Sequence, residues 1–144
     1  MRATVATRGQ GAYFNGQSVC VAPHRRLDEA LISVGFSYRR GAIADATLGA
    51  ISDLLRRQIH GVRRFGSAAL EMCYVGSGML SAYFEYELSP WDFAAARLFV
   101  EEAGGKVTTC QGPTLPLAKT SLLATNGRLH ETILEILRAH EPTA

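Results

Sequence analysis

The segment from Ser89 to Gly105 constrains the fold of this chain most, because it has the start, the body and the end of one helix. Ser89 suits the N-cap, Pro90 suits the first helical position, and two adjacent glycines follow the last turn. The residues between are almost all apolar until two glutamates near the end. We therefore predict a helix over Pro90–Ala103 that is largely buried, with Trp91 as a core anchor.

Asp92 stands at the third position of this helix. An acidic residue three positions after a serine commonly caps a helix, since its carboxylate lies near the positive end of the helix dipole. A carboxylate at the base of a buried helix also needs a cation or hydrogen-bond donors. The residues by themselves leave both roles open for Asp92, helix cap or metal ligand.

Strand-like and helix-like segments alternate along the rest of the chain. We predict further helices over Asp45–Ile59, Ser67–Val75 and Arg128–His140. We predict strands at Ala3–Thr7, Ala30–Phe36, Val62–Arg64, Ser81–Tyr86, Lys106–Cys110 and Leu122–Thr125, and a hairpin over Tyr13–Val21 that turns at Asn15-Gly16. This alternation indicates an α/β fold with crossover connections, and the lack of repeats or linkers favours a single domain over residues 1–144.

The charged residues argue against a nucleic-acid partner. The net charge is only +2, and the arginines occur as scattered pairs without interleaved aromatic residues. Such pairs are typical of solvated faces. The pair Arg63-Arg64 stands apart, because it directly precedes the helix start at Gly66-Ser67.

The apolar residues and cysteines indicate a soluble protein of the cytoplasm. No apolar run reaches the roughly 18 residues needed to span a bilayer, and no apolar leader opens the chain. Cys20, Cys73 and Cys110 are widely spaced and form no zinc-binding pattern. We predict that they are reduced core thiols and that the protein is cytoplasmic and does not bind a membrane.

Two further places carry groups that suit a ligand. Gly66-Ser67-Ala68 opens a helix, whose free N–H groups can hold the oxygens of an anion or a hydroxylated molecule. Capping by Ser67 is the ordinary reading of the same residues. Glu85 lies at the end of a predicted strand, seven residues before Asp92, and its ordinary reading is a surface carboxylate.

The same segments resemble the C-terminal signature of the inositol monophosphatase family. The matching elements are Gly66-Ser67-Ala68-Ala69, Cys73, Gly78, Ala82-Tyr83, Glu85, Trp91-Asp92-Phe93-Ala94-Ala95 and Glu102-Ala103-Gly104-Gly105, preceded by a hairpin at Ala6–Gly16 and followed by a strand at Leu122–Asn126. They stand in the family's order at fitting spacing. The resemblance therefore extends over essentially the whole chain.

The resemblance implies a mixed sheet flanked by helices, like the C-terminal half of the layered αβαβα inositol monophosphatase fold. It also implies a Mg²⁺-dependent phosphomonoesterase that hydrolyses inositol monophosphate or a related small phosphate ester. Asp92 would then be a metal ligand, and Gly66, Ser67, Ala68 and Glu85 would bind the substrate. Histidinol phosphate, sugar bisphosphates and nucleotide phosphates are substrates of similar enzymes.

The family's N-terminal metal-binding motifs are missing from this sequence. There is no Asp-Pro-x-Asp-Gly-Thr loop, and the only Glu-Glu pair, Glu101-Glu102, lies at the far end of the helix from Asp92. One ligand does not make a two-metal site. The chain thus resembles an incomplete half of such an enzyme, and we expect it to be inactive alone. The rival reading is a non-catalytic chain that binds a separate N-terminal half or forms a homodimer.

The chain also departs from the family's pattern close to the predicted site. Ser81 stands where an Asp is usual, and Ala96 stands where a Gly commonly follows the two alanines. Tyr86-Glu87 makes the approach to Asp92 unusually acidic and aromatic. These departures leave the identity of the substrate open.

Overall fold

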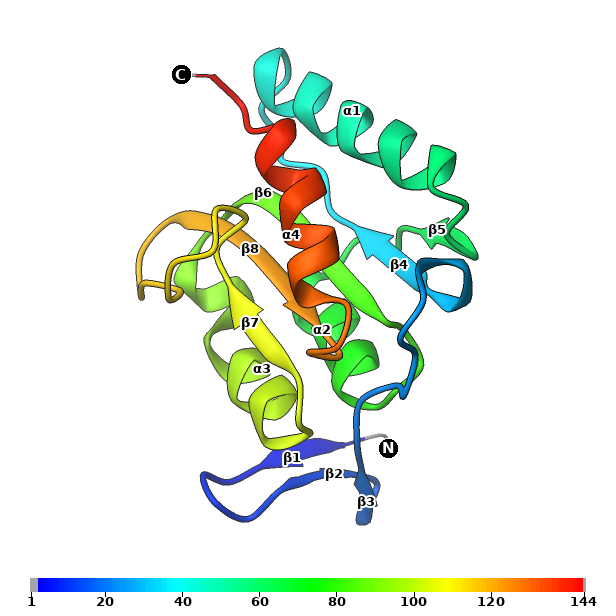
Figure 1. The fold of residues 1–144 in the computed structure, drawn as a ribbon. Coiled ribbons are helices and arrows are strands. Elements are labelled where there is room, and N and C mark those ends of the chain that lie inside the picture. Colours follow the sequence, from blue (N-terminus) through cyan, green and yellow to red (C-terminus); the bar gives the residue numbers. More distant parts are fainter. Residues whose placement is uncertain (1–2, 144) are drawn as a thin grey trace.

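The computed structural model of the protein describes residues 3–143, and Figure 1 shows its ribbon. Within these residues a central sheet has the strand order β5-β4-β6-β8-β7. Its strands are β4 (Leu31–Val34), β5 (Gly61–Arg63), β6 (Ala82–Leu88), β7 (Lys106–Thr108) and β8 (Thr120–Thr125). β4 is parallel to β5 and β6, whereas β8 is antiparallel to β6 and β7. The sheet is mixed, which confirms the predicted fold class.

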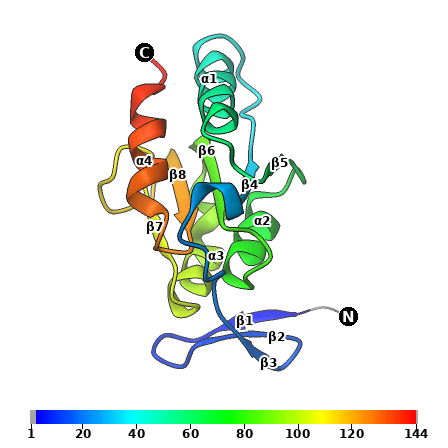
Figure 2. The ribbon, with the colours of Figure 1, turned by 45° about the vertical axis from the view of Figure 1, so that its right-hand side comes forward.

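Helices cover both faces of this sheet (Figures 1 and 2). α1 (Ala42–Arg56) and α4 (His130–Ala139) pack on one face, where Leu54 and Ile133 meet Ile32 and Phe84 of the sheet. α2 (Ala68–Gly76) and α3 (Pro90–Glu102) pack on the other face. The strands lie between two apolar layers, as the crossover connections of an α/β fold require.

Strand β6 carries residues of both layers. Phe84 and Tyr86 belong to the apolar cluster with α1 and α4, whereas Tyr83 belongs to the cluster with α2 and α3. Because side chains alternate along a strand, Glu85 projects to the same face as Tyr83. A carboxylate is thereby placed at the end of the sheet, on the side of α2 and α3.

The N-terminal hairpin forms a separate antiparallel sheet of β1 (Thr4–Ala6), β2 (Ala12–Phe14) and β3 (Gln17–Val19). The predicted turn at Asn15-Gly16 is present, and both residues have positive φ, 49° and 79°. Ala12 packs on Phe99 and Ala103 of the α3 segment. In Figures 1 and 2 this small sheet lies beneath the ends of α2 and α3.

The predicted helix boundaries hold within a few residues, but the expected burial of α3 is wrong. Phe93 and Ala96 are buried, whereas Ala94 and Ala95 are exposed and Trp91 is 84% exposed. Burial follows a stripe with helical spacing, which an almost uniformly apolar sequence does not reveal. Trp91 is therefore not a core anchor.

Three other details differ from the sequence expectations. α1 begins and ends three residues earlier than predicted, and Gln58 turns the chain beyond it with a φ of 61°. β6 continues past Glu85 to Leu88 through a register shift. A short 3₁₀ helix over Leu27–Glu29 precedes β4 and was not predicted.

The three cysteines are free thiols, as predicted, but they are not all core residues. Cys110 is buried, Cys73 is half-buried and Cys20 is exposed. Burial raises the pKa of the Cys110 thiol to about 12. Within residues 3–143, no helix has both the length and the apolar character needed to cross a membrane.

Candidate functional site

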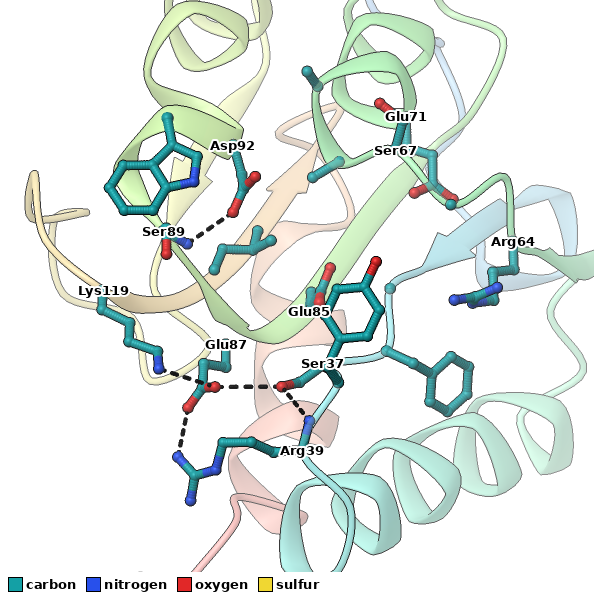
Figure 3. A pocket seen from close by; sticks show the side chains of 18 residues that line it. Ser37, Arg39, Arg64, Ser67, Glu71, Glu85, Glu87, Ser89, Asp92 and Lys119 are labelled. Atoms are coloured by element: carbon teal, nitrogen blue, oxygen red, sulfur yellow. Dashed lines mark hydrogen bonds and ion pairs between the residues drawn. The ribbon is translucent and has the colours of Figure 1, made fainter.

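A cleft of about 670 Å³ lies at the carboxyl ends of the parallel strands β4, β5 and β6. Open α/β sheets bind ligands at this edge, where loops leave the strands and helices begin. Gly66, Ser67, Ala68, Glu85 and Asp92 all line it (Figure 3). The structure thus brings together the five residues predicted to bind substrate or metal, from the start of α2, from β6 and from the start of α3.

The start of α2 forms one wall of the cleft. Gly66 has a φ of 90°, a conformation that favours glycine, and it turns the chain into the helix. Ser67 is the N-cap, and its hydroxyl accepts a hydrogen bond from the N–H of Leu70 at 3.4 Å. Ala68 and Ala69 line the cleft in the first turn, where N–H groups have no partner within the helix. Capping by Ser67 and ligand binding by the next amides are therefore compatible.

Glu85 is held against the backbone at the end of β4. It is 9% exposed, and its Oε2 accepts a 2.6 Å hydrogen bond from the hydroxyl of the fully buried Tyr83. A Cβ atom at Gly35 would lie 1.9 Å from the same oxygen. Burial raises the pKa of Glu85, and the negative charges of Asp92 and Glu71 act in the same direction, against the hydrogen bond from Tyr83. Glu85 is a buried, oriented carboxyl group and not a plain surface residue.

Glu71 of α2 is a third acidic group in the cleft. It is 1% exposed, and its Oε1 accepts a 2.8 Å hydrogen bond from the N–H of Phe65. This bond fixes the turn between β5 and α2. Burial raises the pKa of Glu71, in opposition to this hydrogen bond and the charge of Arg64.

Asp92 caps α3, as its sequence position indicates. One carboxylate oxygen, Oδ2, accepts a hydrogen bond of 2.9 Å from the N–H of Ser89. The residue is half-buried and lines the cleft. The capping bond uses only Oδ2. The other oxygen, Oδ1, is available to a second partner, so Asp92 can cap the helix and bind a ligand at the same time.

An ion-pair network occupies another part of the cleft. Glu87 accepts a hydrogen bond of 2.8 Å from Arg39 and lies 3.2 Å from the ammonium of Lys119. The hydroxyl of Ser37 also donates to Glu87, at 3.3 Å. The network joins the loop after β4, the end of β6 and the residue before β8. Figure 3 shows it on one side of Glu85, with Ser67 and Glu71 on the other.

The carboxylate oxygens of the cleft are donors of the kind that hard cations prefer. Mg²⁺ needs an almost octahedral set of oxygens, of which one or two are usually carboxylates. Within residues 3–143, no three His, Cys, Asp or Glu side chains gather closely enough to hold a metal ion. Asp92 has one carboxylate oxygen outside the capping bond, and the described residues around it do not by themselves form a metal site.

Several residues of the cleft were not predicted from the sequence, among them Gly35, Ser37, Arg39, Glu71 and Lys119. They lie on segments far apart in the chain, and only the strand order brings them to one edge. Arg39 belongs to an arginine pair assigned to a solvated face, and its side chain is in fact 67% exposed. For Glu71 the sequence does offer one signal, because this glutamate stands among the apolar residues of α2, where a charged side chain needs a hydrogen-bond partner.

Curated proteins and solved structures resemble the chain over most of its length. The chain is 40% identical over 130 residues to "Phosphatase IMPL1, chloroplastic" of Arabidopsis thaliana, covering 90% of this chain and 35% of that protein. It is 36% identical over 133 residues to "Nus factor SuhB" of Escherichia coli, covering 92% and 49%. The inositol monophosphatase of Anabaena superposes with a TM-score of 0.90 at 35% identity, over 98% of this chain and 56% of that one.

The chain spans about half the length, or less, of the proteins it matches. The chain also superposes on about half of a Staphylococcus aureus inositol monophosphatase with bound inositol monophosphate. The TM-score is 0.83 at 27% identity, over 96% of this chain and 54% of that one. The profile of the inositol monophosphatase family matches residues 2–141. The chain therefore belongs to the inositol monophosphatase family.

Proposed function

We propose that this chain supplies the substrate-binding half of a Mg²⁺-dependent phosphomonoesterase that hydrolyses inositol monophosphate or a related small phosphate ester. The observation that carries the proposal is the convergence of the start of α2, Glu85 and Asp92 on one cleft. Family membership supports phosphatase chemistry. The missing half would complete the metal site.

Each part of the cleft has a distinct task in this proposal. Asp92 would hold the metal, since only one of its carboxylate oxygens is used to cap α3. Glu85 and the first amides of α2, after Ser67, hold the hydroxyl groups of the alcohol. Because Tyr83 and the backbone at Gly35 fix the position of Glu85, the carboxyl group is ready to receive a hydroxyl without rearrangement.

In this proposal a Mg²⁺ ion held by Asp92 and by ligands of the N-terminal half would lie beside the acidic groups of the cleft. Glu71 and Glu85 both have raised pKa values, mainly because they are buried, and Glu85 also feels the negative charge of Asp92. A cation bound there would relieve this repulsion. When bound, Mg²⁺ lowers the pKa of a bound water and stabilises the charge that develops on the leaving oxygen.

The second candidate function is a binding or assembly module for a separate N-terminal half. The observation that favours it is the incomplete metal site within residues 3–143. A cytoplasmic location and the absence of nucleic-acid or membrane binding stay predictions.

Complementation separates the two candidates. The chain is purified alone and together with the N-terminal half of a relative, and phosphate release from inositol monophosphate is measured with and without Mg²⁺. The proposal predicts no turnover by the chain alone and Mg²⁺-dependent turnover by the complex. A stable complex that releases no phosphate from inositol monophosphate or from other small phosphate esters would instead support the assembly module.

A further inference from the structure

The cleft has a positively charged end that the proposed reaction does not use. Arg39 and Lys119 reach Glu87 from two different loops, and their side chains are 67% and 61% exposed. Glu87 is only 16% exposed, so the carboxylate forms the base of the network and the two cations form its surface. All three residues line the same cleft as Asp92 and Glu85.

We propose that Arg39 and Lys119 form an anion subsite for a second charged group, a phosphate or a carboxylate, on the alcohol of the phosphate ester. This inference rests on the proposed function and narrows its substrate class. A singly phosphorylated, otherwise neutral alcohol would leave the subsite empty.

The charges of the network support an anion as the ligand. Burial acts to raise the pKa of Glu87, but its hydrogen bond with Lys119 and the charges of Arg39 and Lys119 outweigh burial and hold that pKa below its usual range. Glu87 is therefore ionised at neutral pH and neutralises one of the two cations. The network of Arg39, Lys119 and Glu87 therefore has a net charge of +1, and it lines the cleft.

Geometry supports the same ligand. The guanidinium of Arg39 gives one N–H to Glu87, and its fork has further donors for an oxygen anion. Lys119 adds a charge from the opposite loop. Because Glu87 holds both side chains, less side-chain entropy is lost when an anion binds between them.

Glu87 also sets the strength of the subsite. Its negative charge competes with any anion that approaches the two cations. Removing that charge should therefore tighten anion binding, whereas removing either cation should weaken it. If the network only connects the two loops, neither substitution should change anion binding.

The test measures anion binding to the full chain without metal, so it does not depend on turnover. The ¹⁵N-labelled protein is titrated with inorganic phosphate, and in a second series with acetate, at constant ionic strength. We expect saturable shifts of the amide signals of residues 36–40 and 119. Arg39→Gln and Lys119→Gln should each weaken binding about threefold, and Glu87→Gln should strengthen it by a similar factor.

Lys106→Gln is the matched control. Lys106 forms an exposed ion pair with Glu131 at 3.2 Å, outside the cleft. This variant should bind the anions like the wild type. Stronger binding of phosphate than of acetate would assign the subsite to a second phosphate, and the reverse would assign it to a carboxylate.

Three results would overturn the inference. They are shifts confined to residues 66–70, no saturable shift with either anion, or equal weakening by Lys106→Gln and Lys119→Gln. None of these bears on whether the completed protein is a phosphatase. Conversely, an inactive complex leaves the binding result intact.

Discussion

At the scale of single residues, the position of Glu85 depends on a neighbour that never reaches the cleft surface. Tyr83 is fully buried, and its hydroxyl donates to Glu85 at 2.6 Å. The bond stabilises the ionised carboxylate, and its loss should raise the pKa of Glu85 further. We predict that Tyr83→Phe shifts the titration of Glu85 to higher pH, measured from its side-chain ¹³C signal.

Tyr86→Phe is the control for this variant. The hydroxyl of Tyr86 donates to the carbonyl of Leu137 at 2.9 Å, on the opposite face of the same strand. Each substitution should cost about 1 kcal/mol of stability through a lost buried hydrogen bond. Only Tyr83→Phe should shift the pKa of Glu85. Equal titration curves of Glu85 in both variants would contradict the role of Tyr83 in positioning Glu85.

His130 makes the stability of the fold dependent on pH. The ring is fully buried, with Nδ1 2.9 Å from the hydroxyl of Thr125 and Nε2 2.9 Å from that of Thr108. Burial, with the nearby charge of Lys106, lowers the pKa of His130 from 6.5 to about 4.

In the unfolded chain His130 is therefore protonated below about pH 6.5, whereas in the folded chain it is protonated only below about pH 4. Protonation favours the unfolded state in this range, so stability falls from pH 6.5 to 4, by roughly 3 kcal/mol in total. Urea unfolding as a function of pH measures the loss. His130→Gln should be less stable at pH 7 but should lose less on acidification, and parallel curves would refute the assignment.

At the scale of elements, the start of α2 combines a cap with the candidate substrate site. Ser67→Ala removes the hydroxyl that accepts from Leu70 and should cost about 1 kcal/mol in urea unfolding. Ser67→Asp should restore that stability, because Asp also caps well. If Ser67→Ala is as stable as the wild type, the long 3.4 Å bond contributes nothing to the helix.

Elements with strong local signals could be predicted from the sequence. The Asn15-Gly16 turn, the Ser89-Pro90 helix start and the alternation of strands and helices all appear in the structure. The exposure of Trp91 could not be predicted, because it depends on which side of α3 faces the sheet. Likewise, the position of Lys119 in the cleft depends on strand order, which local sequence does not encode.

Part of the candidate site could be predicted, because some of its residues also lie in segments with strong local signals. Gly66, Ser67 and Asp92 belong to helix starts, which have recognisable residue patterns. Tyr83 and Glu71 support the site through contacts with Glu85 and the backbone of Phe65. Their roles became visible only in three dimensions, and the binding roles of the cleft residues remain predictions.

At the scale of the whole molecule, the small N-terminal sheet adjoins an apolar groove. Among the described residues β1 pairs with β2 alone, so its other edge is open. A groove of about 590 Å³ beside it is lined mainly by apolar side chains, with Phe65, Leu70 and Met79 about half exposed. Open edges and apolar grooves of this kind favour association.

We therefore predict that the chain self-associates or binds an N-terminal half of a relative. Sedimentation velocity over a range of concentrations, with a hydrophobic dye as a second probe, measures this. Addition of the N-terminal half should reduce dye binding, since it would cover the groove. A dilute monomer that binds no dye would contradict the prediction and favour a self-sufficient domain.

We propose that Asp92 both caps α3 and ligates the metal of a completed phosphatase site. The direct test is Asp92→Asn in the complex with an N-terminal half of a relative, measured by phosphate release across Mg²⁺ concentrations and by thermal unfolding of the metal-free complex. Asn keeps the cap but removes the charge, so stability should stay within about 0.5 kcal/mol while activity and Mg²⁺ affinity collapse. Full activity with unchanged Mg²⁺ dependence would leave Asp92 as a helix cap only and would contradict the account.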